Sequence, residues 1–390
     1  MRSPRPLPAL LVLVLAAAFA LPSCGAQDGG PIGTGAIRIG AIYSLSGDQA
    51  SLDEPSLRGA ELAVEEINAA GGLLGRPVAL ERADAMSQAA VVAGQARRLY
   101  DVLGLPVVVG LSDTNLAAPV ARLAESLGRV FVTSGATGPQ LVEEAPASTF
   151  LACFSDLSQA AAAADFARDS LGVSTATLLV DQGSDYASNL EQGFRTEFEA
   201  RGGRVIARVA FPGGSLDTAS VAAAAIRTGA DTFYVAAMPD EAAKLVAALG
   251  AAGSTAPILG GDAFDSPVVT GLPAATTRAT WYTTHAFLPP PPVDERVADF
   301  DAAWEARYGS PPTSAFAALG YDAIGLVAKA VRSAGSTEPG ALRAALESIR
   351  DYPGVTGSIS YDARRHVPRK DVTIVGFEGG VPRQAAVVRP

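Results

Sequence analysis

Two successive runs of alternating strands and helices constrain the fold of this chain more than any other feature. The first run has predicted strands at residues 36–45, 77–84, 106–109 and 130–133. The second run has predicted strands at residues 176–181, 204–211, 232–237 and 257–260. Strands that alternate with helices form parallel sheets with right-handed crossovers. The sequence therefore predicts an α/β fold of two doubly wound parallel-sheet lobes, with a ligand cleft between them.

Two buried strands, at residues 106–109 and 130–133, lie at the centre of the first run. Both are short β-branched segments without polar alternation, which is typical of strands covered on both faces. Each is followed by a hydroxyl-rich loop that leads into a helix. Such loops lie at the carboxyl ends of parallel strands, where an open α/β sheet binds its ligands.

These two loops carry the residues that we expect to bind a small anion. Thr114 and Thr137 stand at the predicted helix starts, with Asp113 beside the first and Gly135 and Ala136 beside the second. Free helix N–H groups, threonine hydroxyls and the helix dipole favour a ligand carboxylate here without any arginine. The alternative is that Asp113 and Thr114 only cap a helix.

The second lobe offers acidic and aromatic residues at its own strand ends. Asp181 and Tyr186 follow its first buried strand, and Asp262 follows two glycines at the end of its last parallel strand. A carboxylate that faces the anion-binding loops would suit a ligand's ammonium group, which makes Asp262 the candidate. The alternatives are that Asp262 is a turn or cap residue and that Tyr186 packs in the core.

Composition excludes several classes of function. The net charge is −10, and only three of the 30 basic residues are lysine, with no basic cluster to follow a nucleic-acid backbone. The two histidines, His285 and His366, are far apart, and we find no zinc-ligand set, nucleophile elbow or phosphate-binding loop. We therefore expect no nucleic-acid partner, no metal, no cofactor and no enzymatic activity. His366 lies in a charged turn and is expected to be solvated.

The N-terminus is predicted to direct export. Two arginines precede an apolar run at residues 9–21, which is too short to span a membrane but typical of a signal peptide. The run ends before Cys24 in a pattern that resembles the bacterial lipoprotein cleavage box. We expect a lipoprotein signal at residues 1–24, lipidation of Cys24 and a Gly-rich tether at residues 25–35. The alternative is an ordinary secretory signal with an incidental cysteine.

In this order and spacing, seven motifs resemble the leucine/isoleucine/valine-binding protein family, the type I periplasmic receptors of branched-chain amino-acid ABC transporters. They are IRIGAIYSLSG, LRGAELAVEEINAAGGLLGRPV, VVVGLSDTNLAAPVA, FVTSGATGPQL, SDLSQ, DYASN and LGGDAF. The resemblance covers residues 37–388. It implies the type I periplasmic-binding-protein fold with a three-segment hinge. The expected N-terminal lobe is residues 36–153 plus 286–356, and the C-terminal lobe is residues 154–285 plus 357–390.

The resemblance also implies a role for each candidate residue. Thr114 and Thr137 match hydroxyls that bind the ligand carboxylate, Gly135 and Ala136 match backbone contacts, and Asp262 matches an acid that pairs with the ammonium group. The expected pocket wall is Leu52, Asp113, Tyr186, Met238 and Phe264. Tyr186 matches a tyrosine that covers the ligand, whereas Leu52 and Met238 stand where relatives have aromatic residues.

The implied function is capture of a small, aliphatic or branched-chain amino acid and its delivery to an ABC permease. We expect a monomer that works in the periplasm or elsewhere outside the cytoplasm, anchored to a membrane through Cys24. One alternative is a ligand-sensing receptor of the same fold that binds an amide, a urea-like compound or an aromatic acid. Another is an α/β enzyme acting on a carboxylate.

Overall fold

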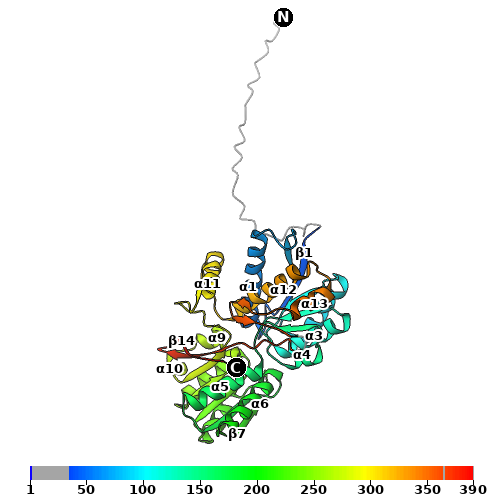
Figure 1. Cartoon of the computed structure of the whole chain (residues 1–390). Coiled ribbons are helices and arrows are strands. Elements are labelled where there is room, and N and C mark those ends of the chain that lie inside the picture. The colour runs from blue at the N-terminus through cyan, green and yellow to red at the C-terminus, as the bar shows by residue number, and fades with distance from the viewer. Residues whose placement is uncertain (2–34, 363–364, 390) are drawn as a thin grey trace. The chain divides into compact units, whose positions relative to one another are not determined.

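Strands and helices alternate along the computed structural model (Figure 1), which describes residue 1, residues 35–362 and residues 365–389. The predicted signal peptide, the tether and Cys24 lie outside the described residues, apart from Met1 and Gly35. The chain divides into Met1–Thr34 and Gly35–Pro390.

A five-stranded parallel sheet forms the first half of this unit. Its strand order is β2-β1-β3-β4-β5, so the chain starts in the interior of the sheet and builds outward on both sides. The strands are β1 (Ile37–Tyr43), β2 (Val78–Asp84), β3 (Val107–Gly110), β4 (Val130–Thr133) and β5 (Thr149–Leu151). All four residues of β3 and of β4 are buried, as expected for strands with helices on both faces.

Helices cover both faces of this first sheet. One face packs against α1 (Ala50–Ala69), α12 (Phe316–Ala334) and α13 (Pro339–Glu347). The other packs against α2 (Ala89–Arg97), the π-helical turn Arg98–Val102 and α3 (Thr114–Leu127). The short α4 (Gln140–Glu144) precedes β5, and α11 (Glu295–Tyr308) contacts α1. Helices from the end of the chain therefore complete the half that the start of the chain builds, as α12 beside α1 shows in Figure 1.

The second half contains a seven-stranded mixed sheet of order β14-β13-β10-β9-β8-β6-β7. Its parallel part is β6 (Thr175–Asp181), β7 (Arg204–Phe211), β8 (Thr232–Ala236), β9 (Ile258–Gly260) and β10 (Thr280–Thr284). The tail adds the antiparallel strands β13 (Val372–Glu378) and β14 (Val381–Val388), in agreement with its predicted alternation. A separate hairpin joins β11 (Tyr352–Gly354) to β12 (Gly357–Ile359).

The second sheet is also covered on both faces. On one side lie α5 (Asp156–Asp169) and α6 (Asp185–Ala200), and on the other α7 (Thr218–Arg227) and α8 (Pro239–Ala251). Shorter helical segments follow β9: a 3₁₀ turn at Asp262–Phe264, α9 (Pro267–Thr270) and α10 (Ala274–Thr277). In the part of the chain that the structure describes, no helix is both long and apolar enough to cross a membrane.

Two glycines allow α1 and α12 to cross at close range. A Cβ atom added at Gly59 would lie 1.8 Å from the carbonyl oxygen of Ala317, and one at Gly320 would lie 1.8 Å from that of Ser56. Neither position tolerates a side chain unless the helices separate. The contact fixes the start of α1 and the start of α12 next to the carboxyl ends of the first sheet.

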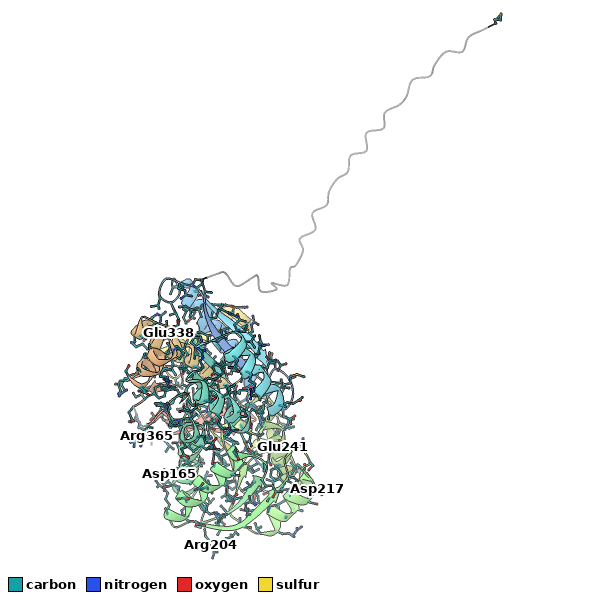
Figure 2. The ribbon with its side chains drawn as sticks, turned by 90° about the vertical axis from the view of Figure 1, so that its right-hand side faces the viewer. Asp165, Arg204, Asp217, Glu241, Glu338 and Arg365 are labelled. Atoms are coloured by element: carbon teal, nitrogen blue, oxygen red, sulfur yellow. The ribbon has the colours of Figure 1, made fainter. Side chains whose placement is uncertain are left out.

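The edges of the second sheet carry charged residues. β7 is one edge strand and exposes Arg204 and Arg208, and Figure 2 shows Arg204 on the surface at the bottom of the view. β14 is the other edge strand and contains Pro382 and Arg383.

Two local predictions are wrong. Thr137 does not begin a helix, because the loop after β4 continues to Pro139 and α4 starts at Gln140. His366 is buried rather than solvated: its Nδ1 lies 3.0 Å from the carbonyl oxygen of Thr149, and its ring stacks on Phe150 with centroids 4.0 Å apart. Its own carbonyl accepts the Leu151 amide, so this part of the tail is fastened to β5. The charged residues around His366 in the sequence therefore gave no indication of this buried aromatic contact.

Candidate functional site

Asp113 and Thr114 lie where the loop after β3 enters α3. Asp113 caps the helix, because its Oδ1 accepts the amide of Leu116 at 2.8 Å. Thr114 is the first helical residue, and its Oγ1 accepts the amide of Gly138 at 3.1 Å. The capping alternative thus holds for Asp113, whereas Thr114 connects the first predicted anion-binding loop to the second. Burial raises the pKa of Asp113 to about 6.

The second loop uses several of its backbone amides within the protein. The amides of Gly135 and Ala136 both donate to the carbonyl oxygen of Leu111, and that of Ala136 also donates to Oγ1 of Thr133. These amides therefore hold the loop onto the end of β3. The expected contacts of Gly135 and Ala136 with a ligand stay a prediction.

Thr137 contacts the second half of the molecule directly. Its Oγ1 donates to Oδ1 of Asp156 at 2.5 Å, and its carbonyl oxygen accepts the Asp156 amide at 2.9 Å. Asp156 is the first residue of α5, fully buried, and its Oδ2 accepts a hydrogen bond from Asn189 on α6 at 2.9 Å. Burial raises the pKa of Asp156 to about 8, although Thr137 and Asn189 lower it.

Sequence reasoning missed Asp156, although it stands in the SDLSQ motif. An acid directly after an N-cap serine ordinarily serves the helix dipole at the surface. The signal that was present is the alanine-rich helix that follows, which indicates burial on most sides of α5.

Asp262 is the second buried acid of this region and has hydrogen-bond partners of its own. Its Oδ1 accepts hydrogen bonds from the Tyr186 hydroxyl and from Nε2 of Gln159, both at 2.9 Å, and its Oδ2 lies 2.9 Å from Nε2 of His285. Nε2 of Gln159 also approaches Oδ1 of Asp156, at 3.4 Å. Gln159 therefore links the two buried carboxyl groups.

His285, for which the sequence predicted no role beyond its absence from any zinc-ligand set, contacts Asp262. Its ring is buried, stacks on Phe154 with centroids 3.7 Å apart and meets Phe316 edge-on. Burial lowers the pKa of His285, so the imidazole is neutral near pH 7 and donates its Nε2–H to Asp262. Because Phe316 begins α12, this contact also joins the two halves.

The apolar residues predicted to line the pocket fall in two hydrophobic clusters. Leu52, Ala136, Tyr186 and Met238 belong to one hydrophobic cluster. Phe264 belongs instead to the cluster under the second sheet, where its ring covers Gly260. The place of Phe264 in the pocket wall stays a prediction to which this packing lends no support.

The assembled network has hydroxyl groups on one half and carboxyl groups on the other. Thr114 and Thr137 come from the first half, and Asp156 and Asp262 come from the second, all nearly fully buried. Hydroxyl and amide groups are the hydrogen-bond partners of the two carboxyl groups, together with neutral His285. These partners include no cation, and ionisation of a buried carboxyl group without a cation is costly.

Two helix-covered sheets with this polar network between them define the class of protein as a type I periplasmic binding protein. The model of the periplasmic binding protein family matches residues 36–381, and the chain belongs to that family. The resemblance to the leucine/isoleucine/valine-binding proteins and the predicted fold class are thereby confirmed.

The similarity to known proteins extends over nearly the whole chain. "Leu/Ile/Val-binding protein homolog 3" of Brucella melitensis is 27% identical over 345 residues, which is 88% of this chain and 92% of that protein. The leucine-binding protein LivK of Thermotoga maritima superposes with a TM-score of 0.85 at 26% identity, covering 91% of this chain and 99% of that one. LivJ of Streptococcus pneumoniae, solved with isoleucine, gives 0.83 at 27% identity over 91% and 99% of the two chains.

Proposed function

We propose that this protein captures a small amino acid between its two α/β halves. The observation that carries the proposal is the contact between Thr137 of the first half and Asp156 of the second. An α-amino acid separates its carboxylate from its ammonium group by a single carbon. A ligand whose carboxylate reaches the Thr137 hydroxyl would therefore bring its ammonium group within reach of Asp156.

The mechanism we propose is closure of the two halves around a zwitterion. Thr114 and Thr137 bind the carboxylate, Asp156 and Asp262 receive the ammonium group, and Tyr186 covers the ligand from the second half. A ligand carboxylate would compete with Asp156 for the Thr137 hydroxyl. The ligand's ammonium group would then donate to Asp156 in place of that hydroxyl. Because the ligand contacts both halves, binding favours the closed arrangement.

We further propose that the bound amino acid is delivered to an ABC permease. The protein would act as a monomer outside the cytoplasmic membrane, held to a membrane by a lipid on Cys24. Membership in a periplasmic family and similarity to a transporter substrate-binding protein support this role. The hinge would consist of three crossings, between residues 36–153 plus 286–356 on one side and residues 154–285 plus 357–390 on the other. The strands β1–β5 in one sheet and β6–β10, β13 and β14 in the other support this division, whereas β12 pairs with β11 in a separate hairpin.

A thermal-shift screen tests the function. At a 100-fold excess over its dissociation constant, an α-amino acid ligand is expected to stabilise the protein by about 2.7 kcal/mol and to raise Tm by about 4 °C. The matched carboxylic acid without the amino group should raise Tm far less, because it leaves Asp156 without a cation. The names of the relatives make aliphatic amino acids the first to test, with leucine against 4-methylpentanoate as one pair. The proposal is rejected if no amino acid raises Tm.

Amino-acid affinity is expected to rise with pH up to about pH 8. The pKa of Asp156, about 8 in this structure, means that its carboxyl group is mostly protonated at pH 7. A ligand ammonium group favours the ionised form and lowers this pKa, so binding releases a proton and tightens by up to about tenfold per pH unit. Titration calorimetry at pH 6, 7 and 8, in two buffers of different ionisation enthalpy, measures the affinity and the number of protons released on binding. Affinity that is flat or falls with pH would contradict this role.

A further inference from the structure

Gln140 and Asn189 join the two halves of the molecule close to the proposed ligand site, although the proposed function uses neither. Gln140 is the first residue of α4 in the first half, and Asn189 lies in α6 in the second half. Nδ2 of Asn189 donates a hydrogen bond to Oε1 of Gln140 at 2.9 Å. The two residues are 49 positions apart in the sequence, so the packing of the halves against each other brings them together.

The side-chain amide of Asn189 also contacts Asp156. Its Nδ2 donates to Oδ2 of Asp156 at 2.9 Å. A side-chain amide has two N–H bonds, so one is used within the second half and the other reaches across to the first half. Asn189 therefore orients the carboxyl group of Asp156, and Gln140 orients Asn189 when the halves are together.

The loop after β4 thus contacts the second half at two points. Oγ1 of Thr137 donates to Oδ1 of Asp156 at 2.5 Å, and three residues later Gln140 accepts a hydrogen bond from Asn189. Asp156 consequently has one carboxyl oxygen held directly by the first half and the other held through Asn189. Separation of the halves would break the bonds of both Thr137 and Gln140 at once.

A second hydrogen bond between the halves lies at the partly exposed rim of the same region. Oδ1 of Asn115, on α3, accepts the backbone amide of Asp185, the first residue of α6, at 3.0 Å. Asn115 is exposed, and the side chains of Gln140 and Asn189 are partly exposed. Water can therefore replace these partners if the halves separate, without leaving a buried polar group unpaired. Such contacts suit a boundary that opens and closes.

We propose that Gln140 and Asn189 are positioning residues that hold the two halves closed over the ligand and aim Asp156 at its ammonium group, without touching the ligand. This inference rests on the proposed function and adds residues that set the affinity of its site. The Gln140–Asn189 hydrogen bond forms only when the halves are closed, so it stabilises the closed arrangement and slows its opening. Because the ligand does not touch Gln140, the gain in affinity is the same for every amino acid that the site accepts.

Binding kinetics of the Gln140→Ala protein test the inference. One hydrogen bond typically changes an equilibrium constant about fivefold, so the dissociation rate should rise about fivefold while the association rate stays within about twofold. Stopped-flow fluorescence with two amino acids that bind the wild-type protein measures both rates, and the two ligands should show the same factor. Asn115→Ala should raise the dissociation rate by a smaller factor, because its contact is exposed to water.

A double-mutant cycle separates this contact from general damage to α6. In the Asn189→Ala protein, which already lacks the contact, adding Gln140→Ala should change the dissociation constant by less than about twofold. Asn189→Ala alone should lose more affinity than Gln140→Ala, because it also frees the carboxyl group of Asp156. Gln192→Ala is the matched control: Gln192 is exposed on α6 and its side chain forms no hydrogen bond within the described residues, so its affinity should stay within about twofold of the wild type.

Three results overturn the inference while leaving the proposed function intact. The first is a Gln140→Ala protein with the wild-type dissociation rate. The second is a loss from Gln140→Ala that is as large in the Asn189→Ala protein as in the wild type. The third is a loss that differs several-fold between ligands, which would place Gln140 against the ligand itself. Failure of every amino acid to bind the wild-type protein instead rejects the proposed function together with this inference.

Discussion

Replacing Asp156 by asparagine is expected to weaken amino-acid binding by about 100-fold or more. The variant removes the charge that would face the ligand ammonium, and an unpaired buried charge costs about 3–5 kcal/mol. Asparagine keeps an oxygen that can accept the hydroxyl of Thr137, so the contact between the halves is retained. Titration calorimetry with the amino acid that gives the largest thermal shift measures the loss.

A control variant on the same helix separates this effect from a general loss of charge. Asp169 is the last residue of α5, is exposed and pairs with Arg201. Asp169→Asn should leave ligand affinity within about twofold, because exposed ion pairs contribute little. An Asp156→Asn protein that binds within threefold of the wild type would show that the ammonium group is received elsewhere.

The companion variant Asp262→Asn decides between the two buried acids. The resemblance assigns the ammonium group to Asp262, but that carboxyl group already accepts hydrogen bonds from Gln159, Tyr186 and His285. If Asp262 mainly positions its neighbours, its variant loses less affinity than Asp156→Asn. The reverse order would restore the role that the sequence predicts.

Gly320→Ala is expected to destabilise the fold by about 3 kcal/mol, the upper part of the range for overpacked cores. The new methyl carbon would lie 1.8 Å from the carbonyl oxygen of Ser56, so α1 and α12 would have to move apart. Gly59→Ala should act in the same way, because its methyl carbon would lie 1.8 Å from the carbonyl oxygen of Ala317. Urea denaturation followed by circular dichroism measures the free energy of unfolding.

Gly94→Ala provides the matched control for this crossing. Gly94 lies inside α2 with no heavy atom within 4 Å of an added Cβ atom, so alanine should stabilise the helix by about 0.5–1 kcal/mol. Equal stability of the Gly320→Ala and Gly94→Ala proteins would show that the α1–α12 contact is not tight.

The strands and most helices could be predicted from sequence because their signals are local. β7 begins and ends at the predicted residues, and the tail strands pair in the predicted antiparallel manner. The loop after β4 is an exception, because Thr137 was predicted to begin a helix. Gly138 and Pro139 follow it, and the helix begins only at Gln140. Turn chemistry there outweighed the expectation that every strand is followed at once by a helix.

The polar network could be predicted only in part, because its contacts join residues far apart in the chain. Thr137 and Tyr186 were predicted as site residues from the motifs around them, but Gln159 bonds to a residue 103 positions away. No periodicity in the sequence reports such a pair. The stacking of His285 on Phe154 likewise joins residues that are far apart in the sequence, and only the folded structure reveals it.

The charged edges of the second sheet affect how readily copies of this protein associate. Unpaired edge strands are templates for strand addition by another molecule, which leads to aggregation. Arginines on β7, and the proline and arginine on β14, disfavour such pairing because a neighbouring copy would have to bury their charges or lose a ladder hydrogen bond. Edge-to-edge pairing between copies is therefore disfavoured even at high local concentration.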